Sequence, residues 1–141
     1  MTLVLRIPGE PIAAPRPRVS GKRTYDPKAA IKKEHAAIIR DQLPDGFVPW
    51  DGPVSLACSF LMPVRKSMTK AQKDDAANGR LYHTKLPDCD NLLKHVMDVL
   101  TQAGVWKDDS VVCSLSANKV YAHGNGEPGT AITMYVIKPR A

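Results

Sequence analysis

The hydrophobic and polar positions along the chain first follow a period of two. Residues 2–7 and 54–62 place apolar side chains at every second position, which is the spacing of a half-buried β-strand. The segments 111–117 and 132–136 repeat this spacing and predict two further strands. The glycine-rich residues 123–129 between them predict a hairpin connection. About four strands are therefore expected.

Other segments follow the helical period. Residues 27–43 are rich in alanine and gather isoleucines near one face, which predicts a first helix that ends before Pro44. Residues 88–103 carry an apolar stripe of leucine, valine and methionine and predict the best-formed helix of the chain. Residues 64–86 are polar, with a short helix predicted after Ser67 or Thr69.

The order of these elements predicts the fold class. Strands and helices that alternate without a regular βαβ repeat indicate an α+β domain, with a small mixed sheet of about four strands and helices packed on it. With 141 residues and no linker-like tract, residues 1–141 are expected to form a single domain. No segment approaches the ~20 apolar residues of a membrane span, and three widely spaced cysteines indicate reduced thiols, so a soluble cytoplasmic protein is expected.

The charges of the chain are sorted into separate segments. Lys and Arg number 20 against 14 Asp and Glu, a net charge of +6, which favours an acidic partner such as nucleic acid. Residues 16–28 hold five basic residues and one acid, whereas residues 87–110 hold five aspartates against two lysines. Such an acidic island in a basic chain is typical of a nuclease that holds Mg²⁺ against phosphate.

The aspartates flank the predicted helix. Asp88 and Asp90 stand one residue apart, so their carboxylates can point to the same side and form half of a metal site, and Lys94 follows Asp90 on the same face. Asp108 and Asp109 come after the other end of the helix, about 27 Å along its axis. Spacing alone does not bring the two groups together, and a wider turn or a second subunit is needed.

Each of these features also has a purely structural interpretation. An aspartate before a helix is commonly a cap, Asp108 and Asp109 fit a solvated turn, and Lys94 fits a surface network with Asp90 and Asp98. The basic residues 16–25 suit phosphate contacts but also a solubilising loop. Lys119 occupies the same alternate positions as the apolar residues of its predicted strand, so its side chain is expected on the core side. At the strand end it reaches either a carboxylate, DNA or solvent. His83, Cys89 and His95 have no zinc-finger spacing.

Several segments together resemble one family. The opening strand followed by PGEPIAAPRPR, the stretch TYDP, the helix KLPDCDNLLKHVMDVL and the segment GVWKDDSVVCSLSANKVY are similar to the RusA family of Holliday-junction endodeoxyribonucleases, which are small dimeric resolvases. The combination of PDxDNLxK with a downstream WxDDS is more specific than any of its parts. The likeness covers most of the chain outside residues 44–84.

The resemblance implies a site. It implies that Asp88, Asp90 and Asp109 bind Mg²⁺, with Mn²⁺ as a possible substitute, that the helix lysine is Lys94, and that both ends of the helix reach one active centre. The role of Asp108 stays open. The resemblance also matches basic residues of this chain to the DNA-binding face of the family. With the basic loop and the strand-end lysine, the expected DNA-binding residues are Arg16, Arg18, Lys22, Arg23, Lys85 and Lys119.

The expected function follows from residues and resemblance together. We expect a Mg²⁺-dependent, structure-selective endodeoxyribonuclease that resolves four-way DNA junctions by paired nicks, acts as a homodimer, and works in the cytoplasm of a bacterial or phage-infected cell. Two alternatives stay open, a nuclease for flap or duplex DNA and a non-catalytic DNA-binding protein whose aspartates only form caps and turns.

Overall fold

The computed structural model describes residues 1–15, 18–20, 23–25, 27–122 and 126–139, and of 18–20 and 23–25 it describes only the backbone. The elements in chain order are β1 (Thr2–Pro8), β2 (Arg18–Ser20), β3 (Arg23–Tyr25), α1 (Ala29–Gln42), β4 (Val54–Met62), α2 (Lys70–Ala77), α3 (Cys89–Gln102), the 3₁₀-helix η1 (Asp109–Val111), β5 (Val112–Tyr121) and β6 (Gly129–Val136).

Four strands form a mixed sheet in the order β1-β6-β4-β5. β6 is antiparallel to both β1 and β4, whereas β5 is parallel to β4. The predicted α+β class with a small mixed sheet is confirmed. The predicted hairpin across residues 123–129 is wrong, because β4 lies between β5 and β6. An alternating apolar pattern identifies a strand but carries no information about its neighbours in the sheet.

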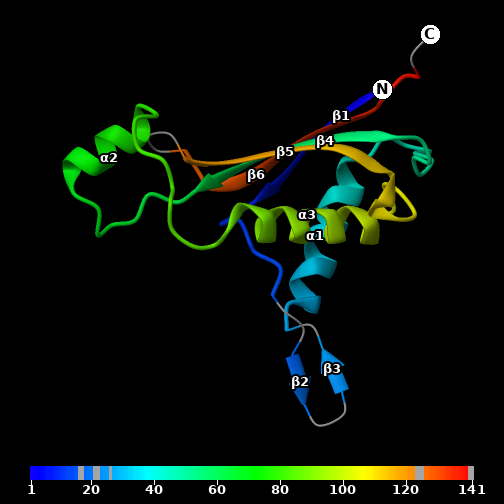
Figure 1. Ribbon diagram of the computed structural model, residues 1–141, viewed down its shortest axis with the longest axis horizontal. Helices are drawn as coiled ribbons and strands as arrows, with labels where there is room; N and C mark the ends of the chain where they lie inside the picture. The colour runs from blue at the N-terminus through cyan, green and yellow to red at the C-terminus, as the bar shows by residue number, and fades with distance from the viewer. Residues whose placement is uncertain (16–17, 21–22, 26, 123–125, 140–141) are drawn as a thin grey trace.

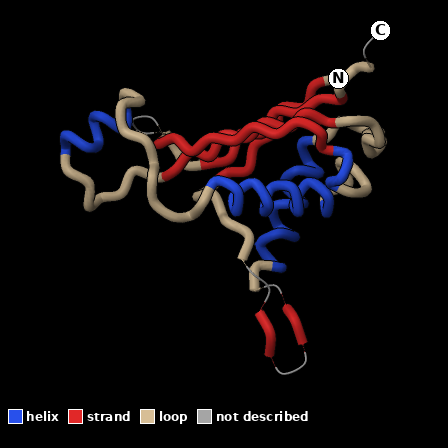
Figure 2. The backbone as a smooth tube through the Cα atoms, in the orientation of Figure 1, coloured by secondary structure: helices blue, strands red, loops and turns tan. Residues whose placement is uncertain are grey.

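The parallel pair explains the position of α3. Two parallel strands need a crossover connection, and α3 is the long helix of the crossover from β4 to β5. Figure 1 shows α3 running along the sheet beside α1, and Figure 2 shows both helices on one face of the sheet, while no helix of the described residues covers the other face. The two ends of α3 therefore lie at opposite ends of the sheet.

The core lies between this face of the sheet and the two helices. β4 alternates strictly between buried and half-buried positions, with its buried side chains toward the helices. The stripe predicted for α3 is confirmed, since Leu92, Val96 and Leu100 are buried there. Each such side chain stabilises the fold by about 1.5–3 kcal/mol. This packing fixes α3, and with it the residues at both of its ends.

The basic segment and the polar excursion both contain regular structure. β2 and β3 pair antiparallel, and Figure 1 shows this small hairpin protruding beyond the helices, where the sequence predicted only a loop. Strands of three residues are too short to show a period. In the excursion, Thr69 caps α2 through a capping box with Gln72, which confirms the helix predicted there. Within the described residues, no helix is long and apolar enough to cross a membrane.

Candidate functional site

Asp88 and Asp90 present two carboxylates at the start of α3. Asp88 occupies the N-cap position in extended backbone, but its side chain makes no capping hydrogen bond. Among the described residues, Asp90 in the first turn accepts a hydrogen bond only from the neighbouring Asn91 amide, at 3.0 Å. Both residues are exposed. The structural interpretation of Asp88 as a side-chain cap therefore does not hold, and its carboxylate is available for another partner.

Lys119 holds the segment that leads into these carboxylates. Its ammonium group donates hydrogen bonds to the carbonyl oxygens of Lys85, at 2.7 Å, and Pro87, at 2.9 Å. Lys119 faces the helix side of the sheet because its register partner on β4 is the buried Phe60. In the sequence, Lys119 occupies the same alternate positions as the apolar residues of its strand, and this spacing indicated that its side chain would point toward the core. The lysine fixes the backbone immediately before Asp88, a role that sequence reasoning did not identify.

Lys94 stands alone on the outer side of α3. The side chain is exposed, and it forms no ion pair with Asp90 or Asp98 in the described part of the chain. Asp98 instead pairs with Lys32 of α1, with 3.2 Å between Nζ and Oδ2. The alternative of a surface network along α3 is therefore not realised. Lys94 is left facing solvent one helical turn after Asp90.

Asp109 lies at the other end of α3, in the turn that starts β5. The turn is anchored by Trp106, whose side chain is buried and donates a hydrogen bond to the Thr101 hydroxyl at 2.7 Å. Asp109 begins η1 and is partly exposed. Because α3 has 14 residues, about 20 Å of helix separates this turn from Asp88.

One chain therefore does not gather the three aspartates. Among the described residues, no group of three or more His, Cys, Asp or Glu side chains lies close enough to hold a metal ion. The wider turn that could have closed the site within the chain is absent, since α3 runs unbroken between the two ends. The same search leaves His83, Cys89 and His95 without a zinc-like grouping. What remains is an exposed pair of hard oxygen donors at one end of α3 and a further carboxylate at the other.

The base of the basic segment is attached to the first turn of α3. The Ala14 amide donates a hydrogen bond to the carbonyl oxygen of Asn91 at 3.0 Å, and Lys28 Nζ donates to the carbonyl oxygen of Ala13 at 2.9 Å. These contacts bring the start of the basic segment next to the two carboxylates. Sequence reasoning missed them, because a backbone contact between distant segments leaves no pattern.

The expected DNA-binding residues are only partly described. Arg16 and Lys22 lie outside the described residues, as do the side chains of Arg18 and Arg23. Lys85 is exposed three residues before Asp88. The structure thus describes the backbone of the β2–β3 hairpin and the position of Lys85, and the DNA contacts of all these residues remain predictions.

A buried histidine pair joins α1 and α3. His35 of α1 and His95 of α3 share a hydrogen bond of 3.0 Å between Nδ1 and Nε2, and their rings meet edge to face. Burial lowers the pKa of His95 to about 4, with a further contribution from the neighbouring His35. Burial also lowers the pKa of His35. Both rings are therefore neutral near pH 7 and join the two helices without adding charge to the core.

The donor set fits a hard divalent cation. Mg²⁺ is commonly held by one or two carboxylates together with waters and phosphate oxygens, and it does not need a closed cage of protein ligands. Asp88 and Asp90 supply such carboxylates, in exposed positions that a phosphate can approach. A soft-metal site, by contrast, needs thiolate or imidazole groups in close proximity.

Comparison with known proteins gives two matches. The family model described as Endodeoxyribonuclease RusA matches residues 8–135, a range that includes both ends of α3 and the aspartates at each. The chain is also 38% identical over 122 residues to "Uncharacterized protein YqaN" of Bacillus subtilis (strain 168), an alignment that covers 81% of this chain and 84% of the relative.

Proposed function

Because this chain belongs to the RusA family of endodeoxyribonucleases, whose members act on junction DNA, we propose that it is a Mg²⁺-dependent nuclease that cuts four-way junctions by paired nicks. The observation that carries the proposal is the pair of exposed carboxylates, Asp88 and Asp90, at the start of α3 with no other role in the described structure. A non-catalytic DNA-binding protein would not need two uncompensated negative charges beside a basic segment.

We propose that the metal site is completed across a homodimer. Asp88 and Asp90 of one protomer form one half of the site, and Asp109 of the second protomer forms the other half. The separation of about 20 Å within one chain rules out joint coordination there, because Mg²⁺ binds its ligands at about 2.0–2.1 Å. A twofold axis across the middle of α3 pairs the start of one helix with the end of the other.

The exposed edge of the sheet supports this arrangement. β5 is an edge strand that lies against α3 and runs antiparallel to it, so a second copy beside β5 also brings its own α3 alongside. Leu115 faces the helix side, because its register partner on β4 is the buried Leu56, yet it is 50% exposed. Free strand edges and exposed apolar side chains are commonly covered by a partner.

The residues of each half then have distinct roles. A bound Mg²⁺ activates a water molecule and neutralises charge on the phosphate. Asp88 and Asp90 would hold the ion beside the scissile phosphate, and Lys94 would neutralise the negative charge that develops on the phosphate oxygens. Lys119 keeps the backbone before Asp88 in place. The basic segment attached at Asn91 positions the DNA strand by phosphate contacts that weaken steeply with salt.

The twofold arrangement suits the substrate. A four-way junction has twofold symmetry at its centre, so a symmetric dimer presents two equivalent sites to two strands of like polarity. Flap DNA lacks that symmetry, and the twofold axis of a duplex relates two strands of opposite polarity. We therefore favour junctions over the other DNA substrates.

The proposal is tested with labelled synthetic DNA. The wild type should nick a four-way junction in Mg²⁺ but not in EDTA, and should leave flap and linear duplex of the same sequence largely uncut. Asp90→Asn should bind the junction as well as the wild type, or more tightly, because a charge that repels phosphate is gone, and should not cut it. Normal cleavage by this variant, or no cleavage of any substrate by the wild type in Mg²⁺ or Mn²⁺, would refute the proposal.

A further inference from the structure

The polar excursion between β4 and α3 forms a lobe, defined here as residues 63–87, that the metal site does not account for. Figure 1 shows the lobe extending beyond the end of the sheet, with α2 at its far side. The loop that follows α2 leads back into α3. Residues 64–86 hold six Lys and Arg against two Asp. Arg65 and Arg80 pair with Glu10 and Asp75, and the four lysines have no ion pair among the described residues. The lobe therefore presents net positive charge.

A hollow of about 170 Å³ lies between this lobe and the end of β5. Its polar and aromatic lining includes Tyr82, Tyr121, Thr84, Lys85, Ser67 and Gln72. Tyr82 is 66% exposed, whereas Tyr121 is buried and forms the inner wall. The hollow thus offers one accessible aromatic ring, hydroxyl and amide groups, and a cation at its rim.

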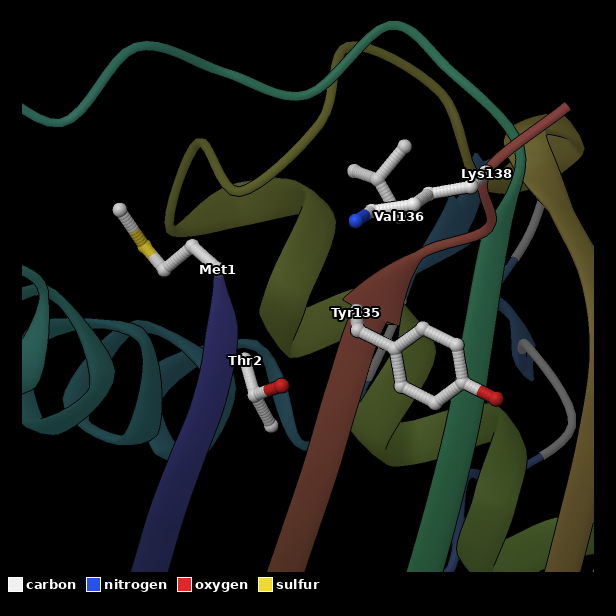
Figure 3. A pocket seen from close by; sticks show the side chains of 5 residues that line it. All are labelled: Met1, Thr2, Tyr135, Val136 and Lys138. Atoms are coloured by element: carbon white, nitrogen blue, oxygen red, sulfur yellow. The ribbon is translucent and has the colours of Figure 1, made fainter.

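A larger hollow elsewhere also has a tyrosine, hydroxyl groups and a lysine in its lining, but it differs in location. It measures about 450 Å³ and lies at the ends of β1 and β6, where Met1, Thr2, Tyr135, Val136 and Lys138 line it (Figure 3). Tyr135 alternates with the buried Met134 and therefore points to the open face of the sheet, away from α3. Tyr121 faces the helix side, because its register partner is the buried Met62. Only the hollow of the lobe shares a face with the candidate site.

The size and chemistry of the lobe hollow fit a single nucleobase. Sites for drug-sized ligands measure roughly 300–1,000 Å³, so this hollow is too small for them. A nucleobase offers a flat ring that stacks on an aromatic side chain and a polar edge that hydrogen-bonds with hydroxyl and amide groups. The ammonium group of Lys85 at the rim suits the phosphate that such a base carries.

The hollow also lies at the correct distance from the carboxylates. Lys85 and Asp88 are three residues apart, and an extended chain spans at most about 3.6 Å per residue, so at most about 11 Å separates their Cα atoms. This is the range of a neighbouring nucleotide on the same strand. Lys119 holds the intervening backbone by its two hydrogen bonds, so the hollow and Asp88 keep a fixed relation.

We propose that this hollow receives one unpaired base of the DNA strand beside the phosphate to be cut, with Tyr82 stacked on the base. The inference rests on the proposed nuclease function and adds a selectivity site to it. A base in continuous duplex must be unstacked and unpaired before it can enter, whereas a base at the exchange point of a junction is already partly free, which lowers that cost. The lobe therefore selects where the strand is cut.

The test uses Tyr82→Ala, with Tyr82→Phe retaining the ring and Tyr135→Ala as a matched exposed tyrosine on the opposite face. A junction with 5-iodouracil at the exchange point is bound without divalent metal and irradiated, and the crosslinked residue is mapped by mass spectrometry. The crosslink should map to Tyr82 in the wild type and to the same position in the Tyr82→Phe variant. It should persist in Tyr135→Ala and be lost in Tyr82→Ala.

A second measurement follows the distribution of cuts along a junction whose exchange point can migrate. Tyr82→Ala should lose about tenfold in preference between sites, as expected when one stacking contact is removed. Tyr82→Phe should keep the preference because it keeps the ring, and Tyr135→Ala should cut like the wild type. The inference is overturned if the crosslink maps to a residue that does not line the hollow, or if Tyr82→Ala keeps the wild-type distribution of cuts. If the wild type cuts no junction at all, the proposed function itself has failed.

Discussion

A mixture of two inactive variants tests the composite metal site directly. Asp90→Asn damages the half-site at the start of α3, and Asp109→Asn damages the half-site at its other end. If each site combines Asp88 and Asp90 of one protomer with Asp109 of its partner, a dimer of one chain of each kind has one site with both defects. Its second site carries no defect. Mixing two dead proteins should therefore restore cutting.

The expected size of the effect follows from the geometry. With about 20 Å between the two ends of α3 and ligand distances of about 2 Å, each variant alone should be inactive. Random pairing makes half of the dimers mixed, and each mixed dimer has one intact site, so about a quarter of the wild-type sites should work. Because that site stands alone in its dimer, it nicks one strand, and paired cuts should be absent.

The assay follows a supercoiled plasmid that extrudes a cruciform, since one nick gives an open circle and paired nicks give a linear product. The two variants are mixed after mild denaturation and refolding, so that protomers exchange. A mixture of Asp88→Asn with Asp90→Asn is the matched control, because both defects then lie in the same half-site and no dimer has an intact site. No open circle from the first mixture, or equal amounts from both, would contradict the composite site.

Two further predictions concern groups behind the site. Lys119→Met removes two hydrogen bonds from a charged donor, so it should lower the free energy of unfolding by about 2 kcal/mol and raise the Mn²⁺ concentration for half-saturation, while junction binding in EDTA is unchanged. Urea titrations and Mn²⁺ binding measured by electron paramagnetic resonance check this, and weaker DNA binding in EDTA would instead make Lys119 a phosphate contact. The pKa of His95 is lowered to about 4 in the folded protein, whereas its ordinary value is 6.5. Below pH 6.5 the unfolded chain therefore binds more protons at this residue than the folded protein does. The free energy of unfolding should therefore fall between about pH 6.5 and 4, by up to about 1.4 kcal/mol per pH unit, and level off above this range. Denaturant titrations across this range that give a flat profile would show that the pair is not buried neutral.

The local parts of this protein could be predicted from its sequence. The strands β1 and β4 and the stripe of α3 follow from side-chain periods, and the capping of α2 by Thr69 follows from the preference of helix starts for hydroxyl side chains. The position of Asp88 and Asp90 at the start of α3 belongs to the same class. Each depends on residues within a few positions of one another.

The relation between the two halves of the site could not be predicted in this way. It depends on β5 being parallel to β4, which makes α3 a crossover and separates Asp109 from Asp88 by the length of the helix. The pattern of the last two strands suggested a hairpin because neighbours in sequence are often neighbours in a sheet. Lys119 could be predicted to point inward but not to bind two carbonyl oxygens, since those acceptors lie more than thirty positions away.

The lobe leaves and rejoins the body at the same end of the sheet. The amide of Ala122, just after β5, donates a hydrogen bond to the carbonyl oxygen of Met62, where the lobe begins, and Lys119 holds the place where it returns. An insertion whose two ends are pinned side by side can change length or sequence at little cost to the rest of the molecule. Evolution can therefore exchange this lobe as a module and retune which DNA is cut while the cutting chemistry stays the same.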